Sequence, residues 1–225
     1  FHLLGGTMAE SARNLARDGI AGTWFGTPSL SAAYADTIAT QSALTTAVQE
    51  AAAFSAIVVC RPTDAGLTTG DDDPVYLSTN TGPAGVAPAG TINGVSLYTV
   101  ANTGALTLYV NRWDGVTHGS APETSVLSGG DAPPLSAWTI ACVRVDADRQ
   151  EIRDWVRAKA QLETGKPSRD VTTRNWRVGG RWSGATLGEA RVAAAMIATG
   201  WIDDTALAFA ANRIRAICEA RGLTF

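Results

Sequence analysis

Residues 175–204 read NWRVGGRWSGATLGEARVAAAMIATGWIDD, and this stretch decides how the chain folds. Its first part, Trp176 to Gly179, alternates between apolar and polar residues, and its second part, Ala190 to Ile197, is a longer apolar segment. Runs of this length that are bounded by turn residues are typical of β-strands. The two segments are therefore expected to form one further pair of strands in a β-sheet protein.

The periodicity changes after the acidic pair Asp203 and Asp204. From there the apolar residues recur at intervals of three and four, which places them on one face of a helix: Leu207, Ala210, Ala211, Ile214, Ile217 and Cys218. The acidic pair suits an N-terminal cap and the positive end of the helix dipole, and Arg221 and Gly222 suit the C-terminus. A closing helix is predicted over residues 203–221, with its apolar face on the outside of a sheet.

Short β-type runs separated by turn signals precede this stretch. The segment Phe54 to Arg61 is apolar on both faces, as expected for a central strand. A turn, "ANTG", joins two alternating runs, so a hairpin is expected there. Further strands are predicted from the same patterns: Val75 to Ser78, Val95 to Val100, Ala105 to Asn111 and Trp138 to Val145. Many short strands of this kind indicate a β-sandwich.

Two segments fit more than one structure. "MAESARNLARDG" (8–19) has the composition of a helix but also fits an irregular lead-in, which is the expectation for residues 1–20. "EIRDWVRAKAQLETG" (151–165) fits a helix through Ile152, Trp155, Val156 and Leu162 and also fits the alternation of a strand. Periodicity alone does not decide between these readings.

Charge and hydropathy argue against two classes of partner. The net charge is −3 with a pI of about 5.4, and the Lys and Arg residues are scattered singly, so no basic surface for nucleic acid is expected. The longest apolar runs, such as Phe54 to Cys60, are much shorter than the roughly 20 residues that cross a bilayer, so no membrane insertion is expected. The sequence starts at Phe1 without a charged-then-apolar leader, which indicates a processed chain or part of a longer one.

The three cysteines lie far apart in the sequence, at Cys60, Cys142 and Cys218. An odd number without CxxC spacing argues against a disulfide framework or a zinc site. Two are inside apolar strand-like runs and one is on the apolar face of the predicted helix, so they are expected to be buried free thiols. Free thiols suit folding in a reducing compartment.

The segments "WRVGG", "GEARVAAAMIA" and "WIDDTALAFAANRIRAICEARG" together resemble the C-terminal third of laminin-G-like jelly rolls, which belong to the concanavalin A-like lectin and glucanase superfamily. Three earlier segments agree with this resemblance: "SARNLARDGIAGTWFGTPSL", "FSAIVVCRPTDAG" and "SAWTIACVRVDADRQEIRDW". The resemblance implies one all-β domain over residues 1–225, a concanavalin A-like two-sheet jelly-roll sandwich with one C-terminal α-helix. It also favours strand over helix from Glu151 onward.

Modules of this kind are common in bacteriophage virions. The resemblance therefore implies a virion protein assembled in the bacterial cytoplasm, as part of a larger multimer of virion subunits. Two functions remain open: a non-enzymatic module that binds host-surface carbohydrate, and a purely structural assembly or decoration domain. A glycan-acting hydrolase is a third hypothesis.

Catalytic residues of the glucanase branch are not found in the sequence. That branch places its carboxylates on one strand as E-x-D-x-x-E, so that alternate carboxyls share a face. "DADRQEIRDW" contains acids, but not in that order, and "DDDP" groups its acids beside a proline. The two histidines, His2 and His118, have no nucleophilic serine nearby, so no enzyme activity is expected.

A metal site would have to use the acidic loop before the proline. Asp71, Asp72 and Asp73 offer the hard oxygen ligands that calcium accepts. The loop lacks EF-hand spacing, so a solvated acidic turn is the expectation and no cofactor is predicted.

The seven tryptophans supply the candidate binding residues. Trp138 and Trp176 are in phase with their strands and are expected in the core, and Trp201 is expected to hold the helix against the sheet. Trp113 and Trp182 instead follow strands, in turns rich in Gly and Arg. An exposed indole beside polar groups suits a sugar ring and its hydroxyls, so a glycan surface is predicted from five residues: Trp113, Trp182, Arg112, Asp114 and Arg181.

Overall fold

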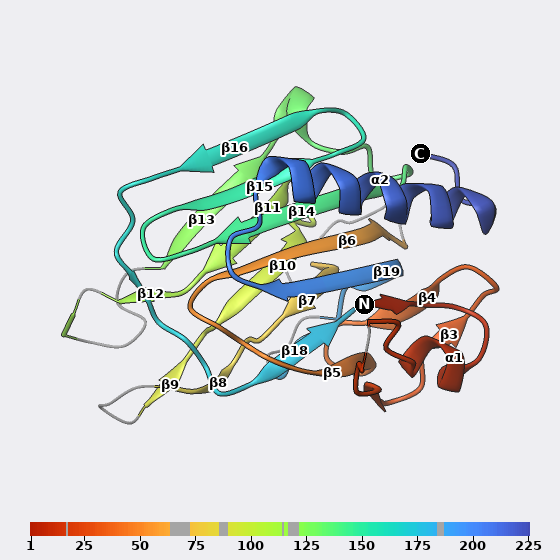
Figure 1. Ribbon diagram of the computed structural model, residues 1–225, viewed down its shortest axis with the longest axis horizontal. Coiled ribbons are helices and arrows are strands. Elements are labelled where there is room, and N and C mark those ends of the chain that lie inside the picture. Colours follow the sequence, from red (N-terminus) through yellow and green to blue (C-terminus); the bar gives the residue numbers. More distant parts are fainter. Residues whose placement is uncertain (17, 64–72, 86–89, 114, 117–121, 184–186) are drawn as a thin grey trace.

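In the computed structural model, the central strand β6 (Phe54–Pro62) is buried on both faces, as its sequence predicted. Phe54, Ala56 and Val58 face the core between two sheets, whereas Ile57 and Val59 face a second core beneath a helix. The structure describes residues 1–225 except 17, 64–72, 86–89, 114, 117–121 and 184–186. Over these residues the chain is an all-β sandwich of two large antiparallel sheets with one C-terminal helix (Figure 1).

The first sheet has eight strands and contains β6 near its centre. In spatial order its strands are β16 (Lys159–Glu163), β15 (Gln150–Asp154), β14 (Thr139–Val145), β6, β19 (Glu189–Thr199), β4 (Ala35–Ile38) and β3 (Ser29–Leu30), with β1 (His2–Leu3) also paired to β19.

The second sheet has seven strands. Their spatial order is β13 (Glu123–Leu127), β11 (Leu106–Val110), β10 (Val95–Thr99), β7 (Val75–Ser78), β18 (Asn175–Val178), β5 (Ala43–Gln49) and β2 (Thr23–Phe25). Two small two-stranded ribbons flank it, β12 (Arg112–Trp113) with β17 (Ser168–Arg169) and β8 (Gly82–Pro83) with β9 (Thr91–Ile92). The predicted hairpin joins β10 and β11, with Leu97 opposite Leu108.

The predicted pairing of Trp176–Gly179 with Ala190–Ile197 is wrong. Strand β18 pairs with β5 and β7 in the seven-stranded sheet, whereas β19 pairs with β6 and β4 in the other. The chain leaves the seven-stranded sheet after Val178 and enters the eight-stranded sheet at Glu189. Gly179 has a φ of +78°, and a Cβ there would lie 2.5 Å from Thr37 Oγ1 of the eight-stranded sheet. Only glycine permits this conformation and this close approach.

The two ambiguous segments are resolved as follows. Residues 150–163 form the hairpin of β15 and β16, so the strand reading is confirmed. Residues 1–20 are not wholly irregular, because they contain β1 and the short helix α1 (Met8–Ala12). Thr7 and Glu10 form a capping box at the start of α1, in which each side chain accepts from the other's backbone N–H. The side chain of His2 is buried.

The closing helix α2 (Asp204–Ala220) confirms the prediction for residues 203–221. Asp203 is the N-cap and accepts a 2.8 Å hydrogen bond from the Ala206 N–H. The helix lies across the outer face of the eight-stranded sheet (Figure 1) and buries one face there: Leu207, Ala211, Ile214 and Cys218. None of the helices among the described residues is long and apolar enough to cross a membrane. All three cysteines are free and buried, as predicted.

Trp201 holds the start of α2 against the sheet, as expected. The guanidinium groups of Arg144 and Arg149 lie 4.6 and 4.0 Å from its ring centroid. Arg144 also forms a 2.7 Å ion pair with Asp204 in the first turn of the helix. The two tryptophans that were predicted as core residues are buried. Trp176 lies between the sheets and Trp138 lies in the core beneath α2.

The substitution Ile214→Ala is expected to lower the free energy of unfolding by roughly 2–5 kcal/mol, because a buried isoleucine is truncated and leaves a cavity. The side chain is 3% exposed, whereas Phe209 on the same helix is 75% exposed. Phe209→Ala is therefore the matched control, and a change of at most about 0.5 kcal/mol is expected. Equal stabilities of the two variants in urea denaturation would show that α2 is not part of the core.

Candidate functional site

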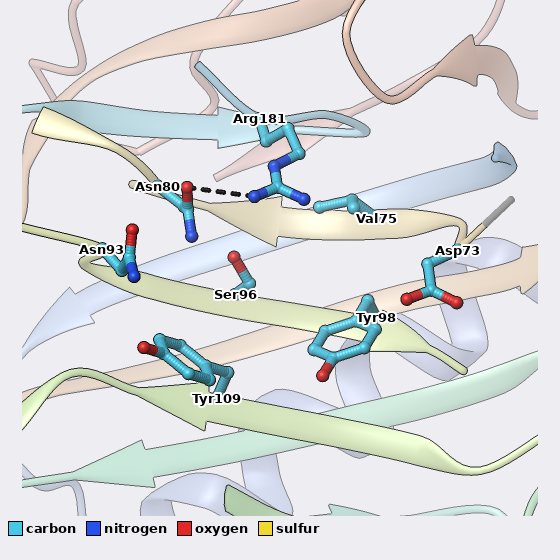
Figure 2. A pocket seen from close by; sticks show the side chains of 8 residues that line it. All are labelled: Asp73, Val75, Asn80, Asn93, Ser96, Tyr98, Tyr109 and Arg181. Carbon is cyan, nitrogen blue, oxygen red and sulfur yellow. Dashed lines mark hydrogen bonds between the residues drawn. The ribbon is translucent and has the colours of Figure 1, made fainter. Parts of the chain in front are cut away.

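The hairpin of β10 and β11 places tyrosines on the outer face of the seven-stranded sheet. Leu97 and Leu108 are 0% exposed in the core between the sheets. Because side chains alternate along a strand, Ser96, Tyr98 and Tyr109 project from the opposite face. They line a pocket of about 260 Å³ (Figure 2), whose lining residues are Asp73, Val75, Asn80, Asn93, Ser96, Tyr98, Tyr109 and Arg181.

The two sides of this pocket differ in chemistry. Figure 2 shows the rings of Tyr98 and Tyr109 along one side, with Asn80 and Arg181 across from them. Arg181 Nη2 donates to Asn80 Oδ1 at 3.2 Å, which fixes both side chains. Asp73 stands at one end, where its Oδ1 accepts from the Ala101 N–H at 2.8 Å. The pocket therefore presents two aromatic faces opposite hydrogen-bonding groups of both polarities.

Burial and nearby charge keep the phenol of Tyr98 in its neutral form. Desolvation raises its pKa above the usual 10, and the charge of Asp73 and the neighbouring Tyr109 raise it further. Desolvation lowers the pKa of Arg181, while Asp73 opposes that effect. Near neutral pH the pocket thus holds a phenol O–H donor, a guanidinium and amide groups.

Trp182 follows Arg181 in the chain, but it does not line the pocket and is not an open platform. Its backbone N–H donates to the Asn80 carbonyl oxygen at 2.6 Å, and its Nε1 donates to the Asn175 carbonyl oxygen at 2.9 Å. Arg177 and Arg174 lie over its ring, 3.8 and 4.6 Å from the centroid. Arg177 and Arg174 thus hold this indole in place by stacking on it.

Arg177 is enclosed between two aromatic rings. Its guanidinium lies 4.4 Å from the Phe25 centroid on β2, and its Nη1 donates to the Arg181 carbonyl oxygen at 2.9 Å. Phe25, Arg177, Trp182 and Arg174 thus form one continuous stack across the outer face of the sheet, which we call the arginine–aromatic stack. This stack supports the turn that carries Arg181 into the pocket.

Arg112 is buried, which corrects the prediction that it contributes to a glycan-binding surface. Its side chain is 0% exposed, and burial lowers its pKa to about 10. The guanidinium donates to five acceptors at 2.9–3.3 Å: the carbonyl oxygens of Asp146, Ala147, Arg149 and Pro167, and Gln150 Oε1. Arg112 therefore ties β12 to the β14–β15 turn of the other sheet and does not reach a surface ligand.

The structure places Trp113 in a different element from the one that carries the pocket. Trp113 is half-buried in the β12–β17 ribbon, where it pairs with Ser168, and not in the sheet that carries the pocket. Asp114 lies outside the described residues, as do Asp71, Asp72 and His118. Asp73 is the one residue of the acidic loop that the structure describes, and it lines the pocket. Among the described residues no group of three or more His, Cys, Asp or Glu side chains could hold a metal ion.

Sequence reasoning missed Tyr98 and Tyr109, although the signal was present. Both occupy the polar phase of predicted strands, opposite the core-facing leucines. The hairpin register places Tyr109 opposite Ser96, so Tyr98 and Tyr109 become diagonal neighbours on one face. Two tyrosines at such positions indicate a surface with aromatic faces. Asn80 and Asn93 come from separate loops, and no local pattern brings them to the pocket.

The chain was compared with known proteins. No protein-family model and no curated protein sequence matches it. Solved structures do match over most of its length, and several of them are receptor-binding domains of botulinum neurotoxins. The receptor binding domain of botulinum neurotoxin D has a TM-score of 0.65 and 6% identity, and the match covers 94% of this chain and 51% of that chain.

Two further structures have the same fold. The binding domain of botulinum neurotoxin DC in complex with SialylT has a TM-score of 0.58 and 9% identity over 85% of this chain and 46% of that chain. The receptor-binding domain of botulinum neurotoxin type G has a TM-score of 0.56 and 9% identity over 86% and 46%. This chain spans about half the length of each of these structures, and the likeness establishes the β-sandwich fold.

The substitution Arg112→Lys is expected to lower the free energy of unfolding by roughly 3 kcal/mol, because a lysine has three donors on one nitrogen and cannot satisfy five acceptors in this arrangement. Arg215→Lys on the exposed face of α2 is the matched control, since its partner Glu219 is equally exposed, and a change within about 0.5 kcal/mol is expected. Guanidinium denaturation measures both. If Arg112→Lys keeps its stability but loses sugar binding, Arg112 is part of the binding site and not a structural residue.

Proposed function

We propose that this chain is a non-enzymatic carbohydrate-binding module that holds a sugar unit in the pocket of Tyr98, Tyr109 and Arg181. The observation that carries the proposal is the placement of two tyrosine rings opposite amide and guanidinium groups in one hollow. Aromatic faces suit the apolar C–H faces of a sugar ring, and the polar groups suit its hydroxyls. A volume of about 260 Å³ is slightly below the roughly 300–1,000 Å³ of typical ligand pockets, which suits one small ring.

The structural neighbours support a binding role. They are receptor-binding domains, and one of them is in complex with SialylT. Each is about twice as long as the matched part, so the printed binding role describes the whole of the longer domain. Their contribution to the proposal is that this sandwich occurs in proteins that bind receptors.

The number of carboxylates that line the pocket also favours binding over hydrolysis. Glycosidases generally need two carboxyl groups about 5–9.5 Å apart, one as acid and one as nucleophile or base. Among the described residues that line the pocket, Asp73 is the only one with a carboxylate. Its Oδ1 is engaged by the Ala101 N–H. A single carboxylate supports recognition of hydroxyl groups.

The setting that we propose is a bacteriophage virion, in which the domain attaches to host-surface glycan. The support for this setting is the resemblance of the C-terminal third to laminin-G-like, concanavalin A-like modules. A shallow polar pocket is expected to bind a single sugar with a dissociation constant of about 1 mM, which corresponds to roughly −4 kcal/mol. Several copies on one particle would raise the avidity by about 10²–10⁴.

The test compares Tyr98→Ala with Trp113→Ala in adhesion of a multivalent display of the domain to host cells and to a glycan array. Tyr98→Ala removes one ring of the pocket, so about 1 kcal/mol of contact and about fivefold in affinity per site are expected to be lost. Trp113→Ala removes an indole from the β12–β17 ribbon and is expected to leave adhesion unchanged. Thermal denaturation confirms that each variant is folded.

Three results would go against this account. Loss of adhesion in folded Trp113→Ala alone would move the site to the β12–β17 ribbon. Full adhesion by Tyr98→Ala and Tyr109→Ala would remove the pocket from recognition. Absence of glycan binding by the wild-type display would leave the structural assembly or decoration role in its place.

A further inference from the structure

Strand β16 is an edge strand of the eight-stranded sheet and lies near the upper margin of the molecule in Figure 1. It pairs with β15 on one side, and over the described residues no strand pairs with it on the other side. An edge of this kind presents backbone N–H and C=O groups that can pair with another chain. Because β16 has 5 residues, the edge is long enough for several such hydrogen bonds.

The other edges of the two sheets are shorter or covered. Strand β3 has 2 residues and β2 has 3. Strand β13 is longer, but its Val126 N–H donates to Gln161 Oε1 at 2.8 Å, and Lys166 Nζ donates to Glu123 Oε2 at 2.8 Å. Side chains of β16 and of the segment after it thus cover the edge of β13, while β16 itself is left open.

The strand register shows which backbone groups of β16 point outward. The Trp155 N–H donates to the Ile140 carbonyl oxygen at 2.9 Å, so the odd-numbered residues of β15 direct their backbone toward β14. The even-numbered residues of β15 therefore bond to β16, where they oppose the odd-numbered residues of that strand. The N–H and C=O groups of Ala160 and Leu162 consequently point away from the sheet, and no described residue hydrogen-bonds to them.

The side chains of these two residues are a protrusion and part of a hollow. Leu162 is 55% exposed. Ala160 is on the same face of the strand and lines a hollow of about 240 Å³ together with Arg153, Trp155 and Ala158. Burial of an exposed leucine is favourable, so the leucine of one copy of the chain suits the hollow of another.

Opposite charges stand at the two ends of β16. Lys159 forms a 2.6 Å ion pair with Asp131, and Glu163 pairs with Lys166, so neither charge is in excess. Charged residues on an edge strand usually oppose its pairing. In an antiparallel pair of two β16 strands, however, Lys159 of each copy lies opposite Glu163 of the other. The charges therefore favour one register of self-pairing.

We infer that the β16 edge is the contact surface for a second copy of this chain, and that two copies pair their β16 strands antiparallel about a two-fold axis at Gln161. In this register Ala160 of each copy opposes Leu162 of the other and exchanges hydrogen bonds with it in both directions, which gives about four backbone hydrogen bonds. Each Leu162 then lies beside the hollow of the other copy. The interface uses the same surface on both copies and closes at the dimer.

This contact goes beyond the proposed sugar binding and leaves the pocket open. The pocket is on the outer face of the seven-stranded sheet, whereas β16 belongs to the other sheet. A pair of short strands buries less than the roughly 1,200 Å² of stable complexes. We therefore expect a weak dimer, with a dissociation constant on the order of 0.1 mM.

The test measures self-association of the full chain by sedimentation equilibrium at concentrations up to about 1 mM. Lys159→Glu and Glu163→Lys each place like charges opposite one another at both ends of the paired strands, and each is expected to weaken dimerisation about tenfold or more. A mixture of the two variants restores opposite charges at both ends. The mixture is therefore expected to form heterodimers with close to the wild-type affinity.

Controls separate this interface from general effects of charge and of folding. Arg215→Glu reverses a charge on α2 and is expected to dimerise like the wild type. Circular dichroism checks that each variant is folded. Amide hydrogen exchange of the wild type is expected to slow at Ala160 and Leu162 as the concentration rises, because their N–H groups become bonded. If Glu163→Lys fails to fold, Lys159→Glu and the amide exchange still test the interface.

Three results would overturn the inference. A wild type that stays monomeric up to about 1 mM would leave the edge to a partner other than a second copy. Dimerisation that is unchanged in folded Lys159→Glu, or that is not restored in the mixture of folded variants, would place the contact elsewhere. Exchange at Ala160 and Leu162 that does not depend on concentration would exclude pairing through β16.

Discussion

The carboxylate of Glu50 is the constraint on which one end of the sandwich depends. Its side chain is 0% exposed and pairs with the guanidinium of Arg169. It also accepts from the hydroxyl of Thr79 at 2.7 Å, and from the N–H and hydroxyl of Thr172 at 3.2 and 2.8 Å. Arg169 in turn donates to the Asn111 carbonyl oxygen at 3.0 Å. In a low-dielectric interior such a network is strong when complete and costly when one member is removed. The segments that follow β5, β7, β11 and β17 are therefore held together by one charge pair.

This network also positions the candidate site. Thr79 accepts from the Val95 N–H at 2.9 Å, so the chain after β7 is fixed to the start of β10. Asn80, the next residue, lines the pocket, and its Oδ1 accepts a hydrogen bond from Arg181. The two outer faces of the sandwich consequently have different roles. Helix α2 covers the outer face of the eight-stranded sheet (Figure 1). The outer face of the seven-stranded sheet carries the pocket and the arginine–aromatic stack.

Local patterns in the sequence predicted most elements of the fold, because periodicity reports which face of a strand or helix is buried. The strand at Val75–Ser78 and the closing helix are examples. Pairing was not predictable from the same patterns, since β18 and β19 are neighbours in sequence but belong to different sheets. The site shows the same limit. Arg112 stands beside a tryptophan in a turn-rich stretch, but its guanidinium donates hydrogen bonds to carbonyl oxygens that lie 34 to 55 residues away in the sequence. Long-range hydrogen bonds of this kind leave no local signature.

The central claim is that ligand binds to the outer face of the seven-stranded sheet. The most direct measurement is an NMR titration of the ¹⁵N-labelled chain with a sugar that it binds, following backbone and side-chain amide shifts. The account predicts that the largest changes fall on Ser96, Tyr98, Tyr109, the side-chain amide of Asn80 and the guanidinium of Arg181, with α2 unaffected. Changes that instead cluster on Trp113 and Ser168 in the β12–β17 ribbon, or along α2, would contradict it.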